Sequence, residues 1–259
     1  MKILVTFALE NEFAPWRAMH KFRAGKWSDA DAYFTEVGSA EVGVVLTGVG
    51  PKQAGLSASG VIWGESESIG LCISSGVAGA LRPEYRIAQI LAARTIYSEF
   101  SRADLQSNTL ESSNALISFA EGCGATIVDR FYSADRVITK AKEKQSLGLT
   151  ADAVEMESFE ILLEAAAFGI PAIAIRAISD LSSQDLPLDM SEILTNEGKV
   201  SIPRVLGQVA MHPTALPELV KLGQQSSRAA EALAQFLERY IVFVSDRAAA
   251  LENKAAAAT

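Results

Sequence analysis

The sequence predicts one α/β domain with a mostly parallel β-sheet, and three observations support this fold class. The chain has 259 residues, which suits one large domain, and no linker rich in Pro, Gly or Ser divides it. Hydrophobic residues make up 49% of the chain and charged residues 21%, so it can bury a sizeable core. Short apolar runs alternate with helical patterns, as they do where helices connect parallel strands.

The individual elements follow from local patterns. Lys2 to Ala8 is short, branched and apolar on both faces, which predicts a buried strand. Gly38 to Ala40 separates two extended runs and predicts a hairpin turn. Pro51 suits the first turn of a helix. The predicted strands are 2–8, 33–38, 41–47, 70–75, 87–96, 125–131 and 171–178, and the predicted helices are 52–64, 114–122, 154–168 and, within helical sequence from 191 onward, 216–244. Residues 1–245 form the single domain, and 246–259 are an alanine-rich, low-complexity tail.

Composition and charge exclude several classes of protein. The net charge is −8, whereas a protein that binds nucleic acid needs a basic surface. The 2 cysteines and 2 histidines show no metal-ligand spacing, which argues against a disulfide framework or a metal site. Acidic residues interrupt the N-terminal apolar run too early for a signal peptide, and no stretch approaches the ~20 apolar residues that span a bilayer. We therefore expect a cytoplasmic protein without metal or cofactor that binds neither nucleic acid nor a membrane.

Acidic residues follow two of the predicted strands. Glu12 comes just after the first strand, and Asp180 ends the strand that begins near Pro171. In an open α/β sheet, ligands bind beyond the carboxyl ends of the strands. Two carboxyl groups that converge there are suited to proton transfer. Each also has a simpler interpretation, because Glu12 could begin a helix and Asp180 could cap a helix or form a turn.

Three further features remain open between structural and functional roles. Glu155 and Glu157 lie near a predicted helix start, about 200° apart around its axis, so at most one should point into a site. Arg176 lies in an apolar run and needs a partner, which could be an acid or a ligand. The segment Gly76 to Gly79 could bind an anion through backbone N–H groups, although a packing turn is the simpler prediction.

Taken together, these segments resemble the purine nucleoside phosphorylase/nucleosidase superfamily, and most of all the methylthioadenosine/S-adenosylhomocysteine nucleosidases. The resemblance covers about residues 1–181, in the order of the family. The matching stretches are Met1–Ile3 with Ala8–Glu12, Thr47–Gly50, Ser75–Leu81, Ser133–Asp135, Val154–Glu157 and Arg176–Asp180.

The resemblance implies a three-layer α/β/α domain with a mixed, mostly parallel sheet, and cleavage of an N-glycosidic bond of a 5′-substituted adenosine. It implies a small-molecule nucleoside substrate and a homodimer. It assigns Glu12 as the base that activates water and Asp180 as the acid that protonates purine N7. Arg176 would help to hold Glu12 or the water. The implied substrate-binding residues are Glu157 at the ribose hydroxyls, Met156 against the sugar, Ile138 at the base through its backbone, and Val137, Ala78 and Gly79.

The sequence favours water over phosphate as the nucleophile. Phosphorylases of this superfamily resemble one another in a Gly-Asp-Pro-x-Arg loop after the first strand, where this chain has Ala8 to Glu12. A carboxylate there would repel phosphate by roughly 4 kcal/mol per charge pair at ~4 Å. A phosphorylase that uses Arg86 or Arg136 for phosphate stays an alternative, as does a nucleoside-binding protein without activity.

Departures from the family pattern concern the 5′ substituent more than the reaction. Val77 replaces a usual Ser, and Val137 replaces a usual Phe that would stack on the base. Ala88-Gln89-Ile90 replaces Gly-Asp-Ile, and Arg136 is unexpected beside the base. A related nucleosidase that acts on futalosine or adenosylhopane therefore also stays possible.

Overall fold

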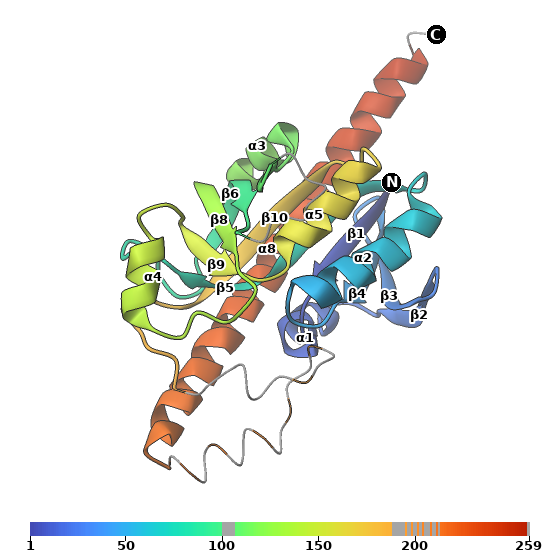
Figure 1. Cartoon of the computed structure of the whole chain (residues 1–259). Helices are drawn as coiled ribbons and strands as arrows, with labels where there is room; N and C mark the ends of the chain where they lie inside the picture. Colours follow the sequence, from blue (N-terminus) through green and yellow to red (C-terminus); the bar gives the residue numbers. More distant parts are fainter. Residues whose placement is uncertain are drawn as a thin grey trace.

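The computed structural model describes residues 1–99, 107–187 and 213–257, together with the single residues 195, 198, 201, 204, 208 and 211; of 248–257 it describes the backbone alone. The described parts form a central sheet with helices on both faces (Figure 1). None of the helices among these residues is both long and apolar enough to cross a bilayer.

The sheet is mixed, and its central strands are parallel. β1 lies between β4 and β5 and is parallel to both, and β10 is parallel to β5 on the other side. The strands are β1 (Lys2–Phe7), β2 (Arg23–Trp27), β3 (Ala30–Val37), β4 (Ala40–Leu46), β5 (Ile69–Ala80), β6 (Ile90–Tyr97), β7 (Thr109–Glu111), β8 (Thr126–Ser133), β9 (Ala153–Glu155) and β10 (Ala172–Asp180). Because β10 pairs with both β5 and β6, the pairings of β5, β10, β6, β8 and β9 close into a ring. Because β1, β5 and β10 are parallel, their carboxyl ends meet at one edge of the sheet.

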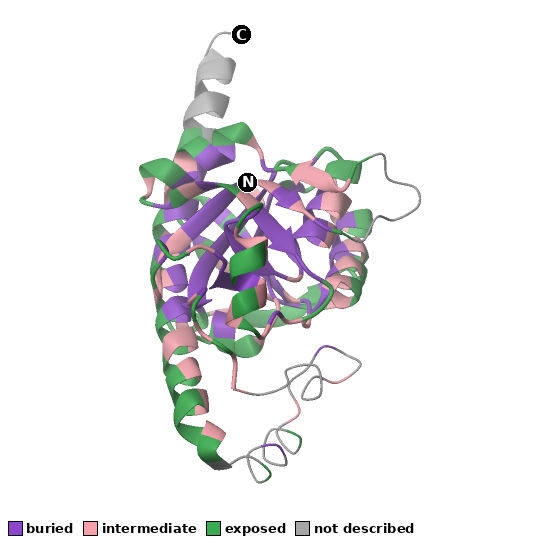
Figure 2. Ribbon diagram, turned by 60° about the vertical axis from the view of Figure 1, so that its left-hand side comes forward, coloured by how far each residue is buried: buried purple, intermediate pink, exposed green. Residues whose placement is uncertain are grey.

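The helices form two layers, one on each face of the sheet. α1 (Glu10–Arg17), α3 (Asn114–Gly122) and α8 (Leu216–Ala257) pack on one face, and α2 (Pro51–Glu65) and α5 (Ser158–Ala167) pack on the other. The short helix α4 (Ala141–Leu147) follows β8, and a 3₁₀ turn, Pro213–Ala215, precedes α8. Figure 2 shows the buried sheet between helices whose outer surfaces are exposed.

Alternation along the strands explains why the sheet has two buried faces. In β1, Ile3, Val5 and Phe7 contribute to the core beneath α1, α3 and α8, whereas Leu4 contributes to the core beneath α2 and α5. Tyr240 of α8 is fully buried, and its hydroxyl donates to the Leu116 carbonyl of α3 at 3.1 Å. Each strand residue thus meets one helical layer, as a strand covered on both faces requires.

Several predicted elements are confirmed. The hairpin forms between β3 and β4, with Gly38 at a φ of 58° in the turn. The predicted helix 114–122 is α3, and the helix that begins at Pro51 is α2. Of the helical sequence predicted from 191 onward, the part 191–212 lies mostly outside the described residues. The predicted helix 216–244 is part of α8, whose backbone continues through 246–257 of the predicted tail.

Two local predictions are wrong. The segment Gly76 to Gly79 is not a turn, because β5 continues to Ala80 with β10 paired on one side and β9 on the other. The helix predicted over 154–168 is divided into β9 and α5. A strand of three residues carries too little periodicity to be recognised without its partners.

Candidate active site

A cavity of about 280 Å³ lies at the shared edge formed by the carboxyl ends of β1, β5 and β10. It brings together eight of the nine predicted site residues: Glu12, Ala78, Gly79, Val137, Ile138, Met156, Glu157 and Asp180. Arg176, the ninth, does not line it. Leu9 and Asn11 of the stretch Ala8–Glu12 also line the cavity, as do Leu186, Leu222 and Ser226, which were not predicted as site residues. Leu222 and Ser226 come from α8, far along the chain, where no local motif marks them.

Glu12 is a buried residue of α1, and three backbone N–H groups hold its carboxyl group. Ala8 and Leu9 each donate to Oε2 at 3.0 Å, and Val77 donates to Oε1 at 3.0 Å. Gly76 has a φ of +149°, and a Cβ there would lie 3.1 Å from Oε1. The segment that could bind an anion thus binds the Glu12 carboxyl group, and glycine leaves the space for it.

Burial changes the acidity of Glu12. Desolvation raises its pKa above the ordinary value, and this effect exceeds the opposing influence of the three N–H groups and of the Arg176 charge. A carboxylate with a raised pKa is a stronger base than an exposed one. Glu12 is therefore suited to take a proton from a molecule in the cavity.

Arg176 lies beneath the cavity, where it binds a second group of polar residues. Its Nη2 donates to Glu155 Oε2 at 2.6 Å, to Ser158 Oγ at 2.9 Å and to Ser74 Oγ at 3.2 Å. Among the described residues, no hydrogen bond joins Arg176 to Glu12. The sequence left either an acid or a ligand as the partner of this guanidinium group. In the structure the partner is an acid, Glu155.

Glu155 and Glu157 differ from the prediction made for them. They precede α5 instead of lying within it, so the angle of 200° around a helix axis does not apply, and both are buried. Glu155 Oε2 accepts from the backbone N–H of Glu157 at 3.0 Å and of Ser158 at 2.7 Å, which caps the helix start. Glu157 Oε1 accepts from Gly50 N–H at 2.9 Å and faces the cavity.

The pKa of Glu157 is raised, first by burial and then by the negative charge of Glu155. The unfolded chain therefore releases this proton at lower pH than the folded protein does, and the free energy of unfolding falls as pH rises between the two values.

Glu157→Gln should remove this loss of stability, because Gln can still accept from Gly50 N–H and never ionises. We expect the variant to match the wild type near pH 4 and to exceed it by at least about 1 kcal/mol near pH 8, since the pKa of Glu157 is raised from 4.5 to about 8 and one pKa unit corresponds to about 1.4 kcal/mol. Urea unfolding at both pH values measures the difference. Glu121→Gln, an exposed change on α3, is the control. An equal effect at both pH values would contradict this account.

Asp180 has a charged partner, Lys144, that was not predicted from the sequence. Ser179 Oγ donates to Oδ1 at 2.8 Å, and Nζ of Lys144 donates to Oδ2. Lys144 is fully buried and belongs to α4, a helix that was not predicted. Lys140 and Lys142 lie nearby in the sequence, and no local pattern distinguishes Lys144 from them. Its burial depends on how α4 packs against the chain after β10.

The arginines considered for phosphate are not free cationic sites in the cavity. Arg136 lines the cavity, but its guanidinium forms an ion pair with Glu143. Arg86 lines a separate surface hollow with Ile87 and Gln89. Neither side chain offers the cavity an unpaired positive charge.

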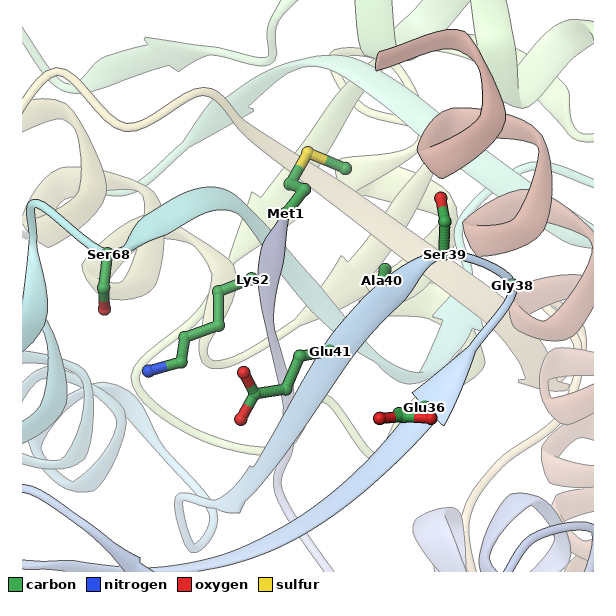
Figure 3. Close-up of a pocket in the computed structure, with 8 residues that line it drawn as sticks. All are labelled: Met1, Lys2, Glu36, Gly38, Ser39, Ala40, Glu41 and Ser68. Atoms are coloured by element: carbon green, nitrogen blue, oxygen red, sulfur yellow. The ribbon is translucent and has the colours of Figure 1, made fainter. Parts of the chain in front are cut away.

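A second hollow, of about 510 Å³, lies at the opposite edge of the sheet (Figure 3). Lys2, Glu36 and Glu41 contribute its charged side chains, and all three are at least partly exposed. No buried polar groups converge there, so it is a weaker candidate than the cavity with Glu12 and Asp180. Among the described residues, no cluster of three or more His, Cys, Asp or Glu side chains could hold a metal ion.

Solved structures share this fold over most of the chain. A 5′-methylthioadenosine/S-adenosyl homocysteine nucleosidase of Helicobacter pylori matches with a TM-score of 0.71 and 18% identity, covering 93% of this chain and 97% of that one. A futalosine hydrolase mutant of the same organism matches with a TM-score of 0.71 and 17% identity over 93% and 98% of the two chains. The nucleosidase of S. pneumoniae matches with a TM-score of 0.71 and 16% identity over 94% and 100%. At these identities the likeness shows the fold alone.

The sequence itself matches a family model. The model of the phosphorylase superfamily matches residues 2–241, which include every predicted site residue. The mixed sheet with helices on both faces agrees with the fold that the resemblance predicted. Because the match spans nearly the whole sequence, this chain belongs to the phosphorylase superfamily.

Proposed function

We propose that this protein hydrolyses the N-glycosidic bond of a 5′-substituted adenosine of the methylthioadenosine or S-adenosylhomocysteine type and releases adenine. The observation that carries the proposal is the convergence of Glu12 and Asp180 in one cavity, with the Glu157 carboxyl group in its wall. Nucleosidases with the same fold, one for 5′-methylthioadenosine/S-adenosylhomocysteine and one for futalosine, add support.

Asp180 acts at the base. Cleavage of the ribose–purine bond leaves an oxocarbenium-like sugar and an anionic base, so a proton on N7 turns the base into a neutral leaving group. The carboxyl group can also accept a hydrogen bond from the 6-amino group, which favours adenine over hypoxanthine or guanine. Val137 and Ile138 form the apolar wall of the base site.

Glu12 and Glu157 act at the sugar. Glu12 takes a proton from water as that water attacks C1′, and its raised pKa suits it to this role. Glu157 binds the ribose hydroxyl groups and holds the sugar while positive charge develops. Met156 packs against the sugar, and Ala78 and Gly79 complete the adjacent wall. Arg176 holds Glu155, and through it the start of α5 beside Glu157.

Hydrolysis is favoured over phosphorolysis on electrostatic grounds. Glu12 follows β1, where the phosphorylases of this superfamily resemble one another in a Gly-Asp-Pro-x-Arg loop, and its carboxyl group would repel a phosphate bound beside it. Arg136 is paired with Glu143, and Arg86 lies outside the cavity. A phosphorylase would need an unpaired cation, whereas Arg136, an arginine among the described lining residues, is paired with Glu143.

The decisive experiment incubates the protein with a panel of adenosine derivatives, with and without phosphate, and follows released base by chromatography. The panel contains methylthioadenosine, S-adenosylhomocysteine, futalosine and adenosylhopane. Adenine release without phosphate supports the proposal. Strict phosphate dependence with a ribose 1-phosphate product would select a phosphorylase, and binding without turnover would select a nucleoside-binding protein.

Gly76→Ala tests the support of Glu12. The new Cβ would meet Oε1 at 3.1 Å, and a φ of +149° strains any residue with a side chain. We expect kcat to fall about 10-fold or more, because small displacements of a reacting group are costly. Gly60→Ala on α2 meets nothing within 4 Å and should keep full activity. Equal activity of the two variants in adenine release would refute this role of Gly76.

The same resemblance leads us to propose a homodimer. Leu56 and Trp63 on α2 are 61% and 69% exposed, so their apolar surface is available to a protein contact. Light scattering after size-exclusion chromatography measures the oligomeric state, and a monomer at micromolar concentration would contradict the proposal.

A further inference from the structure

We propose that Lys144 supplies, through Asp180, the proton that the departing base receives. This inference rests on the proposed function, since it concerns the acid of that reaction. Lys144 is absent from the lining of the cavity, so it acts through Asp180 as a positioning and proton-holding residue.

The contacts of Lys144 match those of a fully protonated ammonium group. Nζ donates to Asp180 Oδ2, to the Gln184 carbonyl at 3.0 Å and to the Leu181 carbonyl at 3.4 Å. Three N–H groups thus meet three acceptors. The side chain is 0% exposed, so water does not compete for them. Lys144 joins α4 to the end of β10 and to the chain that follows it.

Asp180 is confined by these contacts. Oδ1 accepts from Ser179 Oγ at 2.8 Å, and Lys144 is the one cationic group that contacts the carboxyl group among the described residues. Gly79 leaves the space for it, because a Cβ there would lie 2.9 Å from Oδ2. The carboxyl group therefore keeps one orientation, with one side on Lys144 and the cavity beside it.

This arrangement locates the proton. An acid that protonates N7 must hold or share a proton, yet a neighbouring ammonium group favours the ionised form of a carboxyl group. Nζ, which donates to Asp180 and to two carbonyl groups, therefore carries the proton nearest to the carboxyl group. The hydrogen bond from Nζ to Oδ2 gives this proton a direct path to the carboxyl group when Asp180 gives up a proton on the cavity side.

One proton passes from Nζ to Asp180, and Asp180 donates a proton to purine N7 while the C1′–N9 bond breaks and its electron pair stays on the base. Water forms the new C1′–O bond and loses a proton to Glu12. The site then holds a protonated Glu12, an ionised Asp180 and a neutral Lys144. Glu12 releases one proton to solvent and Lys144 gains one, which restores the starting state.

The test compares Lys144→Met and Lys144→Arg with wild type on two substrates that share the same 5′ group. One is the adenosine derivative that the panel identifies, and the other is its p-nitrophenyl riboside, whose leaving group needs no proton. We expect kcat for adenine release to fall about 10²–10³-fold in both variants. Release of p-nitrophenol should stay within about threefold of wild type. Arg fails as well because a guanidinium does not give up its proton in proteins. Lys142→Met, exposed on the same helix, is the matched control.

Each other result overturns the inference. Equal losses on both substrates would mean that Lys144 only supports the structure, and recovery by Arg would mean that positive charge alone suffices. If Met does not fold at this buried position, the Arg variant carries the same comparison. If wild type releases adenine and Lys144→Met matches it, the inference fails and the proposed function stands. If wild type cleaves no nucleoside, the proposed function fails and the inference falls with it.

Discussion

Glu12→Gln is expected to lower kcat for adenine release by about 10²–10⁴-fold, the range for loss of a general base. Gln keeps the size of the side chain but cannot accept a proton from water. Its amide would also face either Val77 N–H or the N–H groups of Ala8 and Leu9, all of which donate to the carboxyl group. Single-turnover measurements separate the chemical step from substrate binding, which should change less than kcat.

Glu10→Gln is the matched control for this variant. Glu10 lies on the same helix, half-exposed and paired with Arg17 at 2.5 Å, and it does not line the cavity. Exposed pairs of this kind contribute at most about 1 kcal/mol, so activity should stay within twofold of wild type. A Glu12→Gln enzyme that keeps more than a tenth of wild-type kcat would remove Glu12 from the mechanism.

The wild-type pH profile gives an independent measure of Glu12. Its pKa is raised from the ordinary value of 4.5, so the basic form is lost on acidification at a higher pH than for an exposed glutamate. The acid limb of kcat/KM should accordingly lie above pH 4.5. An acid limb at or below that pH would assign the base to another group.

Asp180→Asn should lower kcat for adenine release by about 10²–10⁴-fold, because Asn cannot protonate the departing purine. It should also destabilise the fold by roughly 3–5 kcal/mol, because the fully buried ammonium group of Lys144 then lacks its counter-charge. Chemical unfolding and adenine release measure the two effects. Asp129→Asn, an exposed change on β8, is the control and should alter neither.

The double variant Asp180→Asn with Lys144→Met separates folding from catalysis. Replacing both members of a buried ion pair is often neutral, so it should recover much of the stability lost by Asp180→Asn alone. Its activity should remain low, because no acid faces the base. A double variant that is less stable than Asp180→Asn would show that the pair is not the origin of the loss.

The residues nearest to strand ends were predictable. Glu12 and Asp180 each follow an apolar run of strand length, and the carboxyl ends of parallel strands meet at one edge of a sheet. Their presence in one cavity therefore required only the correct strands in a parallel sheet. The hairpin of β3 and β4 and the helix α3 were predictable for a similar reason, since their signals lie within a few residues.

Other parts of the site depend on contacts between distant segments. Glu155 ends a strand of three residues that exists because β5 and β8 flank it. Leu222 and Ser226 reach the cavity from α8. Gly76 has a positive φ and no side chain, and both leave room for the carboxyl group of Glu12 from α1. None of these relations leaves a periodic pattern in the sequence.

The sequence by itself determined the fold class, the edge of the sheet where the cavity lies and the two acids at that edge, because strand length, alternation and polarity are local properties. Only the tertiary structure decided the electrostatic state of those acids. The Val77 N–H group at Glu12 and the ammonium group of Lys144 on Asp180 come from segments far apart in the chain, and Glu155 lies beside Glu157 in a buried site. Burial and the distance between charges set these interactions, and both exist only after the chain has folded.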